Sequence, residues 1–120
     1  MPSVVVVGGI IQCSHKGTVK LSSGDGRLEI AGAAALTAGM EVGLSFAPGA
    51  PGVVVPCPFS TAGGPSPCSA TLKATAGVST QLTIGGLGVL LDNATGQATN
   101  TPPATWSIAQ AGQTLVSVDD

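Results

Sequence analysis

The sequence predicts a small all-β domain made of short strands. Runs of valine, isoleucine and leucine recur along the chain, and 18 glycines and 9 prolines separate them. No segment repeats its apolar residues with the helical period of 3.6. A length of 120 residues suits one domain around one core, so residues 1–120 are expected to fold as a single unit.

The expected strands follow the apolar runs and end at turn residues. In chain order they are 4–12, 17–22, 27–30, 41–46, 52–55, 70–74, 81–84, 88–91 and 114–118. The first is almost continuously hydrophobic, which predicts burial on both faces. The alanine-rich stretch 33–40 contains glycine and has no polar face, so a turn or a strand is expected there instead of a helix. With no tyrosine, one tryptophan and two phenylalanines, the core is expected to consist of aliphatic side chains.

The chain also contains a possible internal repeat. The sequence of residues 13–32, "CSHKGTVKLSSGDGRLEIAG", can be laid over that of residues 68–86, "CSATLKATAGVSTQLTIGG", with small shifts in the turns. The aligned pairs include Cys13 with Cys68, Leu28 with Leu82, and Ile30 with Ile84. Two related halves would each bring one cysteine to the same place.

The charge content excludes several classes of partner. The chain has 4 basic and 6 acidic residues, with a net charge of -2 and no basic block to neutralise phosphates. Nucleic acid and an anionic membrane surface are therefore not expected as partners. The first apolar run is far shorter than the roughly 18 residues that span a bilayer, and no lysine or arginine precedes it as in a signal peptide. A surface with so little charge predicts that a protein partner covers part of it.

The cysteines and the histidine suggest a metal site. Three cysteines cannot all pair in disulfides, and the one histidine lies two residues from the first of them. Residues i and i+2 of a strand point to the same face, so Cys13 and His15 are expected to share an ion. Cys57 and Cys68 each have a proline neighbour that stiffens the backbone. These four residues complete a tetrahedral ligand set, for which zinc is the first choice and iron the second.

A disulfide is the alternative to this metal site. Cys57 and Cys68 would then pair with each other, Cys13 would be a buried thiol, and His15 would lie on the surface. The sequence leaves both arrangements open.

No catalytic constellation is apparent, so the protein is not expected to be an enzyme. A cysteine–histidine nucleophile pair needs a third group to orient the histidine, and no carboxylate lies near His15 in the sequence. The acidic residues are scattered, and no second histidine exists to activate a serine.

Several stretches together resemble the PAAR-like family, the spike-tip proteins of contractile injection systems. They are "VVGGIIQCSHKGTVKL", "RLEIAG", "VVVPCPF", "PCSATLKA" and "LTIGGLGVLLDNATG". The chain is most similar to the short members found in extracellular, phage-tail-like particles. It departs from the family in lacking the Pro-Ala-Ala-Arg tetrapeptide, and it offers a single histidine where many members use several.

The resemblance implies a small conical β-rich domain with a metal bound by histidine and cysteine near its vertex. It implies a role as the structural spike tip that caps a trimeric spike protein, one copy per trimer, and sharpens it for piercing an envelope. An effector could be carried as cargo. Such a protein would be assembled in the bacterial cytoplasm, sit at the tip of an extracellular or cell-associated particle, and meet the target membrane only on puncture.

Two other functions remain open on the sequence alone. A small metal-binding redox or storage protein would need an open coordination position or an exposed reactive thiol. A surface adhesin or carbohydrate-binding module would need an aromatic platform, which a chain with one tryptophan and no tyrosine lacks.

Overall fold

The computed structural model describes residues 2–99 and 104–118, and in this part of the chain all regular structure is β. The strands are β1 (Ile10–Cys13), β2 (Thr18–Lys20), β3 (Asp25–Ile30), β4 (Ala33–Ala35), β5 (Val53–Val55), β6 (Ser60–Thr61), β7 (Gly64–Pro65), β8 (Ala76–Ile84), β9 (Leu87–Ala98) and β10 (Ala104–Gln110). The predicted all-β class is therefore confirmed, as is the absence of a helix over 33–40. The described residues contain no helix of the length and apolarity needed to span a membrane.

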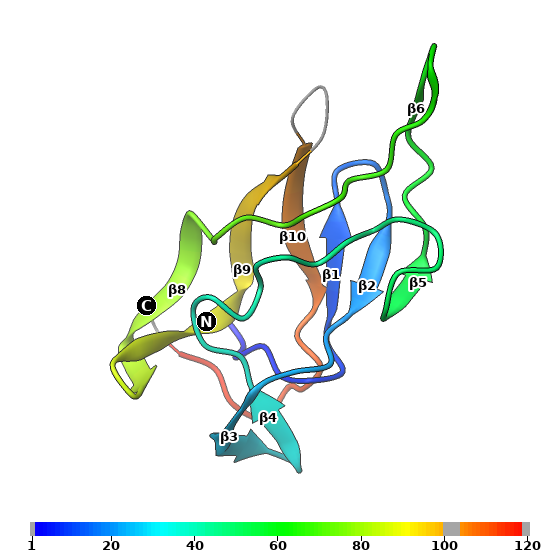
Figure 1. The fold of residues 1–120 in the computed structure, drawn as a ribbon. Coiled ribbons are helices and arrows are strands. Elements are labelled where there is room, and N and C mark those ends of the chain that lie inside the picture. The colour runs from blue at the N-terminus through cyan, green and yellow to red at the C-terminus, as the bar shows by residue number, and fades with distance from the viewer. Residues whose placement is uncertain (1, 100–103, 119–120) are drawn as a thin grey trace.

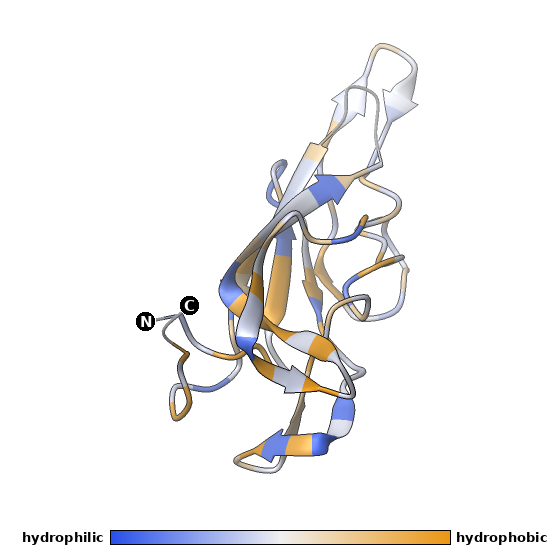
Figure 2. Ribbon diagram, turned by 90° about the vertical axis from the view of Figure 1, so that its left-hand side faces the viewer, coloured by the Kyte–Doolittle hydropathy of each residue, from blue (hydrophilic) through white to orange (hydrophobic). Residues whose placement is uncertain are grey.

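A six-stranded antiparallel sheet forms the body of the protein, in the order β5-β2-β1-β10-β9-β8. Two small hairpins, β3–β4 and β6–β7, lie outside it. The molecule is elongated, with extents of 45 × 24 × 22 Å, and the two hairpins project at opposite ends of it (Figures 1 and 2). One end is thus drawn out into the narrow β6–β7 hairpin.

The first apolar segment is only partly a strand. Regular pairing covers β1, whereas the preceding valines form isolated bridges, from Val4 to Leu91 and from Val6 to Ala35. Its burial on both faces is confirmed, because Val4, Val5 and Val6 have no exposed surface. Val5 packs into the larger of two buried clusters, and its two neighbours pack into the smaller one. The segment therefore separates the two cores.

The larger core is less aliphatic than expected. Its largest fully buried side chains are Trp106 and Phe46, so the tryptophan and one of the two phenylalanines fill its centre. The indole N–H of Trp106 donates to the Leu72 carbonyl oxygen at 3.0 Å, which satisfies its one polar group. A Cβ on Gly96 of the neighbouring strand β9 would lie 2.5 Å from the indole nitrogen, so a glycine is needed beneath the ring.

Three of the predicted strands, 41–46, 70–74 and 114–118, are wrong. Their backbone groups form isolated bridges or other hydrogen bonds instead of regular strand pairing. Segments 41–46 and 70–74 run side by side, joined by the Gly43 N–H donating to the Thr71 carbonyl at 2.9 Å. The buried Glu41 carboxylate accepts the N–H of Ala74 at 2.8 Å. This bond holds the two segments together without regular strand pairing. Segment 114–118 forms a turn around the Gln113 side chain, which accepts two backbone N–H groups and donates to two carbonyls.

The sequence missed β10 and the second half of β9. Both are rich in threonine, serine, glutamine, asparagine and alanine, and their apolar run is too weak to stand out. They lie in the middle of the sheet, and β10 pairs with β1 on one side and with β9 on the other. Alternate residues of the end of β9 are buried, so small side chains suffice to fill this part of the core.

The internal repeat stays a prediction. Four of its aligned apolar residues pack around the same smaller core; they are Leu28, Leu82, Ile30 and Ile84. The elements differ, however, since Cys13 ends a strand and Cys68 lies in a segment without regular structure. The two aligned cysteines do approach each other.

Candidate metal centre

The three cysteine sulfurs converge at the base of the β6–β7 hairpin. Cys13 is the last residue of β1, and Cys57 and Cys68 lie on the two chain segments that lead into and out of the hairpin. All three Sγ atoms lie within 4.8 Å of one another. The side chains are buried, with exposed fractions of 2%, 5% and 0% in chain order. The cluster can therefore hold a metal ion that is closed off from solvent.

The spacing of the sulfurs fits an ion better than a disulfide. The Sγ atoms of Cys57 and Cys68 lie 3.9 Å apart, whereas a disulfide bond measures about 2.05 Å. Two sulfurs bound at about 2.3 Å to a tetrahedral zinc ion lie about 3.8 Å apart. Within the described residues all three cysteines are outside disulfides. The alternative of a Cys57–Cys68 disulfide with an isolated Cys13 is thus not the arrangement in this structure.

His15 borders the cluster on one side. Its Nδ1 lies 3.6 Å from the Cys68 Sγ, which is about the nitrogen–sulfur edge of a tetrahedral zinc site. Among the described residues, the group whose donor atoms all lie within 4.8 Å of one another is the three cysteines alone. His15 follows β1 in a turn where Lys16 has a φ of 76°, so the strand geometry predicted for Cys13 and His15 is wrong. The turn, and not strand alternation, brings the imidazole to the cluster.

Phe59 fixes the orientation of the imidazole. The two rings stack with centroids 4.1 Å apart and an interplanar angle of 16°. Phe59 lies directly before β6, so the stack ties the β1–β2 turn to the hairpin. No sequence pattern singled out Phe59, although its place two residues after Cys57 was a usable signal.

Backbone N–H groups point at two of the sulfurs. The Gly17 N–H donates to the Cys13 sulfur at 3.2 Å. The His15 amide also acts to lower the pKa of Cys13, and the amides of Cys68 and Phe59 act to lower that of Cys57. Such donors stabilise a thiolate more than a thiol. A ring of amides around buried sulfurs therefore suits metal-bound thiolates.

The thiol pKa values reflect these competing effects. Burial raises the pKa of Cys13, and the neighbouring Cys57 adds to this, while the two amides oppose it. At Cys57 burial acts in the same direction, but the amides of Cys68 and Phe59 and the two nearby thiols outweigh it, so the pKa is lowered. Cys57 therefore becomes a thiolate more readily than Cys13 does.

Gly17 permits the close approach of the β1–β2 turn to the hairpin base. A Cβ at this position would lie 2.8 Å from the Cys57 Cα and 2.9 Å from its Cβ. Only a residue without a side chain fits between the two segments. From the sequence, Gly17 was expected only at the start of a strand and not at the site.

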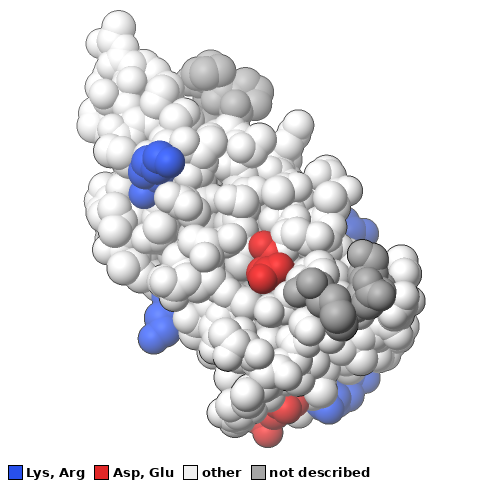
Figure 3. Space-filling view, turned by 180° about the vertical axis from the view of Figure 1, so that it is seen from behind, with Lys and Arg blue, Asp and Glu red and all other residues white. Residues whose placement is uncertain are grey.

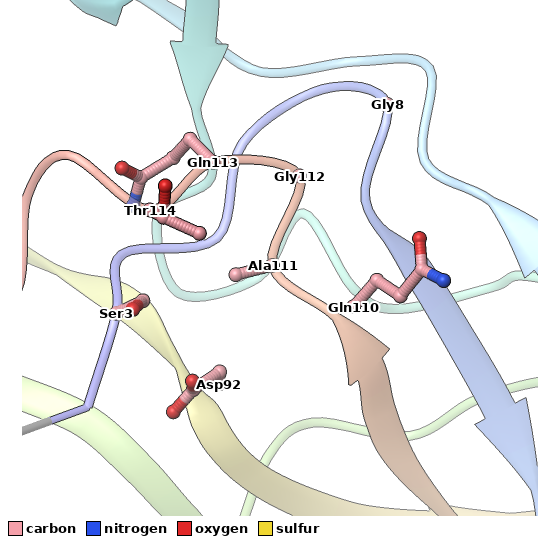
Figure 4. A pocket seen from close by; sticks show the side chains of 8 residues that line it. All are labelled: Ser3, Gly8, Asp92, Gln110, Ala111, Gly112, Gln113 and Thr114. Carbon is pink, nitrogen blue, oxygen red and sulfur yellow. The ribbon is translucent and has the colours of Figure 1, made fainter.

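Other parts of the described surface have fewer groups that could bind a metal or take part in a reaction. An open hollow of about 660 Å³ is lined by Ser3, Gly8, Asp92, Gln110, Ala111, Gly112, Gln113 and Thr114 (Figure 4). The Gln113 side chain is already hydrogen-bonded to backbone groups, among them the Val4 carbonyl and the Val116 N–H. On the rear face charged side chains are few and scattered, and the projecting end carries none there (Figure 3). The expectation that the protein is not an enzyme stays a prediction.

Comparisons with protein-family models, with curated proteins and with solved structures found no match to this chain. Its function is therefore inferred from its own residues.

Proposed function

We propose that this protein is the structural spike tip of a contractile injection system, where one copy caps a trimeric spike protein. The observation that carries the proposal is the buried three-cysteine cluster at the base of the projecting hairpin. It joins the end of β1 to both segments of the narrow end, where strand pairing is minimal. An ion at this place would stiffen the narrow β6–β7 end, which in this proposal is the end that first meets the target envelope.

The ligands in this proposal are Cys13, Cys57, Cys68 and His15. Three thiolates and an imidazole favour zinc in a closed tetrahedral site, with iron as the second choice. When bound, the ion supplies rigidity and no reaction. Structural zinc contributes about 10–16 kcal/mol of apparent binding free energy in small peptides, which is comparable to the whole net stability of a domain. One ion is therefore sufficient to hold the narrow end together.

The shape and the charge distribution agree with a docked, mechanical role. No charged residue occurs between Val42 and Leu72, the part of the chain that contains the hairpin. Large hydrophobic side chains are exposed on and near this region, among them Val54 and Leu72 at 55% and 45%. The sheet ends in two edge strands, β5 and β8, to which a β-rich spike can add a strand.

In this role the protein would be assembled in the bacterial cytoplasm and would act at the tip of an extracellular or cell-associated particle. It would contact the target membrane only during puncture. The burial of all three thiols weighs against the alternative of a redox or metal-storage protein, which needs an accessible thiol or an open coordination position.

The test is capture of an affinity-tagged chain from the bacterium that produces it, followed by native mass spectrometry of what is bound. The proposal predicts one tagged chain per three copies of a spike protein. A homotrimer of this chain with no spike attached, or a native hydrolase activity, would count against it. Thiol labelling of the metal-loaded protein separates the alternative, since a redox protein would be labelled without denaturation.

A further inference from the structure

We propose that Cys57 and Cys68 are also a site of thiol–disulfide exchange, which becomes active when the ion is lost. A disulfide then closes the base of the β6–β7 hairpin, and Cys13 stays a thiol. This inference rests on the metal centre proposed above, because the ion is what protects the two thiols in the loaded protein.

The backbone holds the two cysteines side by side without help from an ion. The Phe46 N–H donates to the Cys68 carbonyl at 3.0 Å, and the Phe46 carbonyl accepts the Cys57 N–H at 2.9 Å. Phe46 is fully buried and therefore fixed in the larger core. The two sulfurs lie 3.9 Å apart, so they need to close by about 1.9 Å to reach bonding distance. Neither residue belongs to a strand, and a shift of this size breaks no ladder.

Cys13 is a poorer partner for either sulfur. It ends β1 in the middle of the sheet, opposite Trp106 of β10. Its N–H donates to the Gly17 carbonyl at 2.9 Å, and its sulfur accepts the Gly17 N–H. Moving Cys13 toward the hairpin would break pairing in a central strand.

The hairpin gives a reagent access to the pair. Its ladder consists of two residue pairs, Ser60 with Pro65 and Thr61 with Gly64. Most of its residues are exposed, and the His15–Phe59 stack and the packing of Gly17 on Cys57 close it against the β1–β2 turn. Local opening of so small a unit costs little free energy, and it uncovers Cys57, the more exposed of the two cysteines.

The oxidant in this proposal is a low-molecular-weight disulfide such as oxidised glutathione. The Cys57 thiolate attacks one sulfur of the reagent, forms a mixed disulfide and releases one thiolate. The Cys68 thiolate then attacks the Cys57 sulfur and releases the second. Two protein thiols are oxidised, one small disulfide is reduced to two thiols, and the two protons pass to those products.

The experiment starts from protein purified in reductant, whose metal content is measured first. One half is kept loaded, the other is stripped with a strong zinc chelator, and both are incubated with oxidised glutathione without oxygen. Denaturation, alkylation and peptide mapping then report each cysteine. The stripped protein is expected to form the Cys57–Cys68 disulfide at least tenfold faster than the loaded protein, with Cys13 alkylated in both.

Two variants test the assignment of the two exchange steps to Cys57 and Cys68. Cys13→Ser is expected to form the same disulfide, whereas Cys68→Ser should stop at a mixed disulfide with glutathione on Cys57. Pairing that involves Cys13, equal amounts of all three pairings, or stable glutathione adducts on the unaltered chain would each overturn the inference. A reduced protein isolated without metal would instead refute the metal centre, so the two failures are distinguishable.

Discussion

Replacing Gly17 with alanine should weaken metal binding without changing a ligand. The added Cβ would lie 2.8 Å from the Cys57 Cα, against about 3.5–4.0 Å for an ordinary carbon–carbon contact. The base of the hairpin must therefore move away from the β1–β2 turn by roughly 0.7 Å. Gly17 has no positive φ, so the alanine brings a clash but no backbone strain.

The expected loss follows from the cost of overpacking. Inserting a methyl group into a packed site costs about 1–3 kcal/mol. In the metal-free protein the hairpin base can shift, whereas in the loaded protein the ion holds Cys57 against the turn. The strain therefore falls mainly on the loaded state, and 1–3 kcal/mol corresponds to roughly 5-fold to 150-fold weaker binding.

Competition for zinc with a chromophoric chelator measures this affinity. Gly26→Ala is the matched control, because Gly26 is an exposed glycine of β3 with nothing within 4 Å of the added Cβ and no positive φ. The control should bind zinc as the unaltered protein does. Affinities of Gly17→Ala and Gly26→Ala that agree within twofold would refute the close packing of the turn on Cys57.

Three further predictions concern the ligands, the pH dependence and the docking face. Cys68→Ser and His15→Ala should each lower both the metal content and the melting temperature, and a His15→Ala protein with unchanged zinc affinity would remove His15 from the ligand set. The Arg27 side chain and N–H hold the pKa of Asp25 at about 2, below its usual value of about 3.9. The folded-state pKa is depressed, so this stabilisation is present above about pH 4 and is lost as the pH falls towards 2. Asp25→Asn should thus melt below the unaltered protein at pH 6 but not at pH 2, and a gap independent of pH would contradict this. Binding to the isolated spike should change little between 50 and 500 mM NaCl, because few charges are available; a tenfold loss would refute an apolar docking face.

The sequence predicted the fold class and the meeting of the cysteines, but not all of the strands. Glycine, proline and valine patterns are local, and they correctly indicated many short strands. Segments 41–46 and 70–74 have the same local pattern, yet the buried Glu41 carboxylate accepts the backbone N–H groups of Gly39 and Ala74, and neither segment pairs as a strand. A side chain that satisfies distant amides cannot be recognised from the sequence pattern.

The site was predictable in its residue types and not in its geometry. The odd cysteine number and the single histidine pointed to residues that the structure brings together, whereas the approach of His15 depends on a turn with Lys16 in the left-handed region. Gly17 and Phe59 act through contacts with segments about 40 residues away, Cys57 in one case and His15 in the other. Only the folded arrangement of the β1–β2 turn and the hairpin shows these roles.

The most direct test of the central claim, that the three buried cysteines hold a structural ion, is native mass spectrometry of the chain purified in reductant. The predicted result is the mass of one chain plus one zinc ion, with the ion lost on acidification because protons compete for thiolate and imidazole. Cys68→Ser measured in the same way should carry less metal. A fully folded chain with no bound metal at neutral pH would contradict the claim.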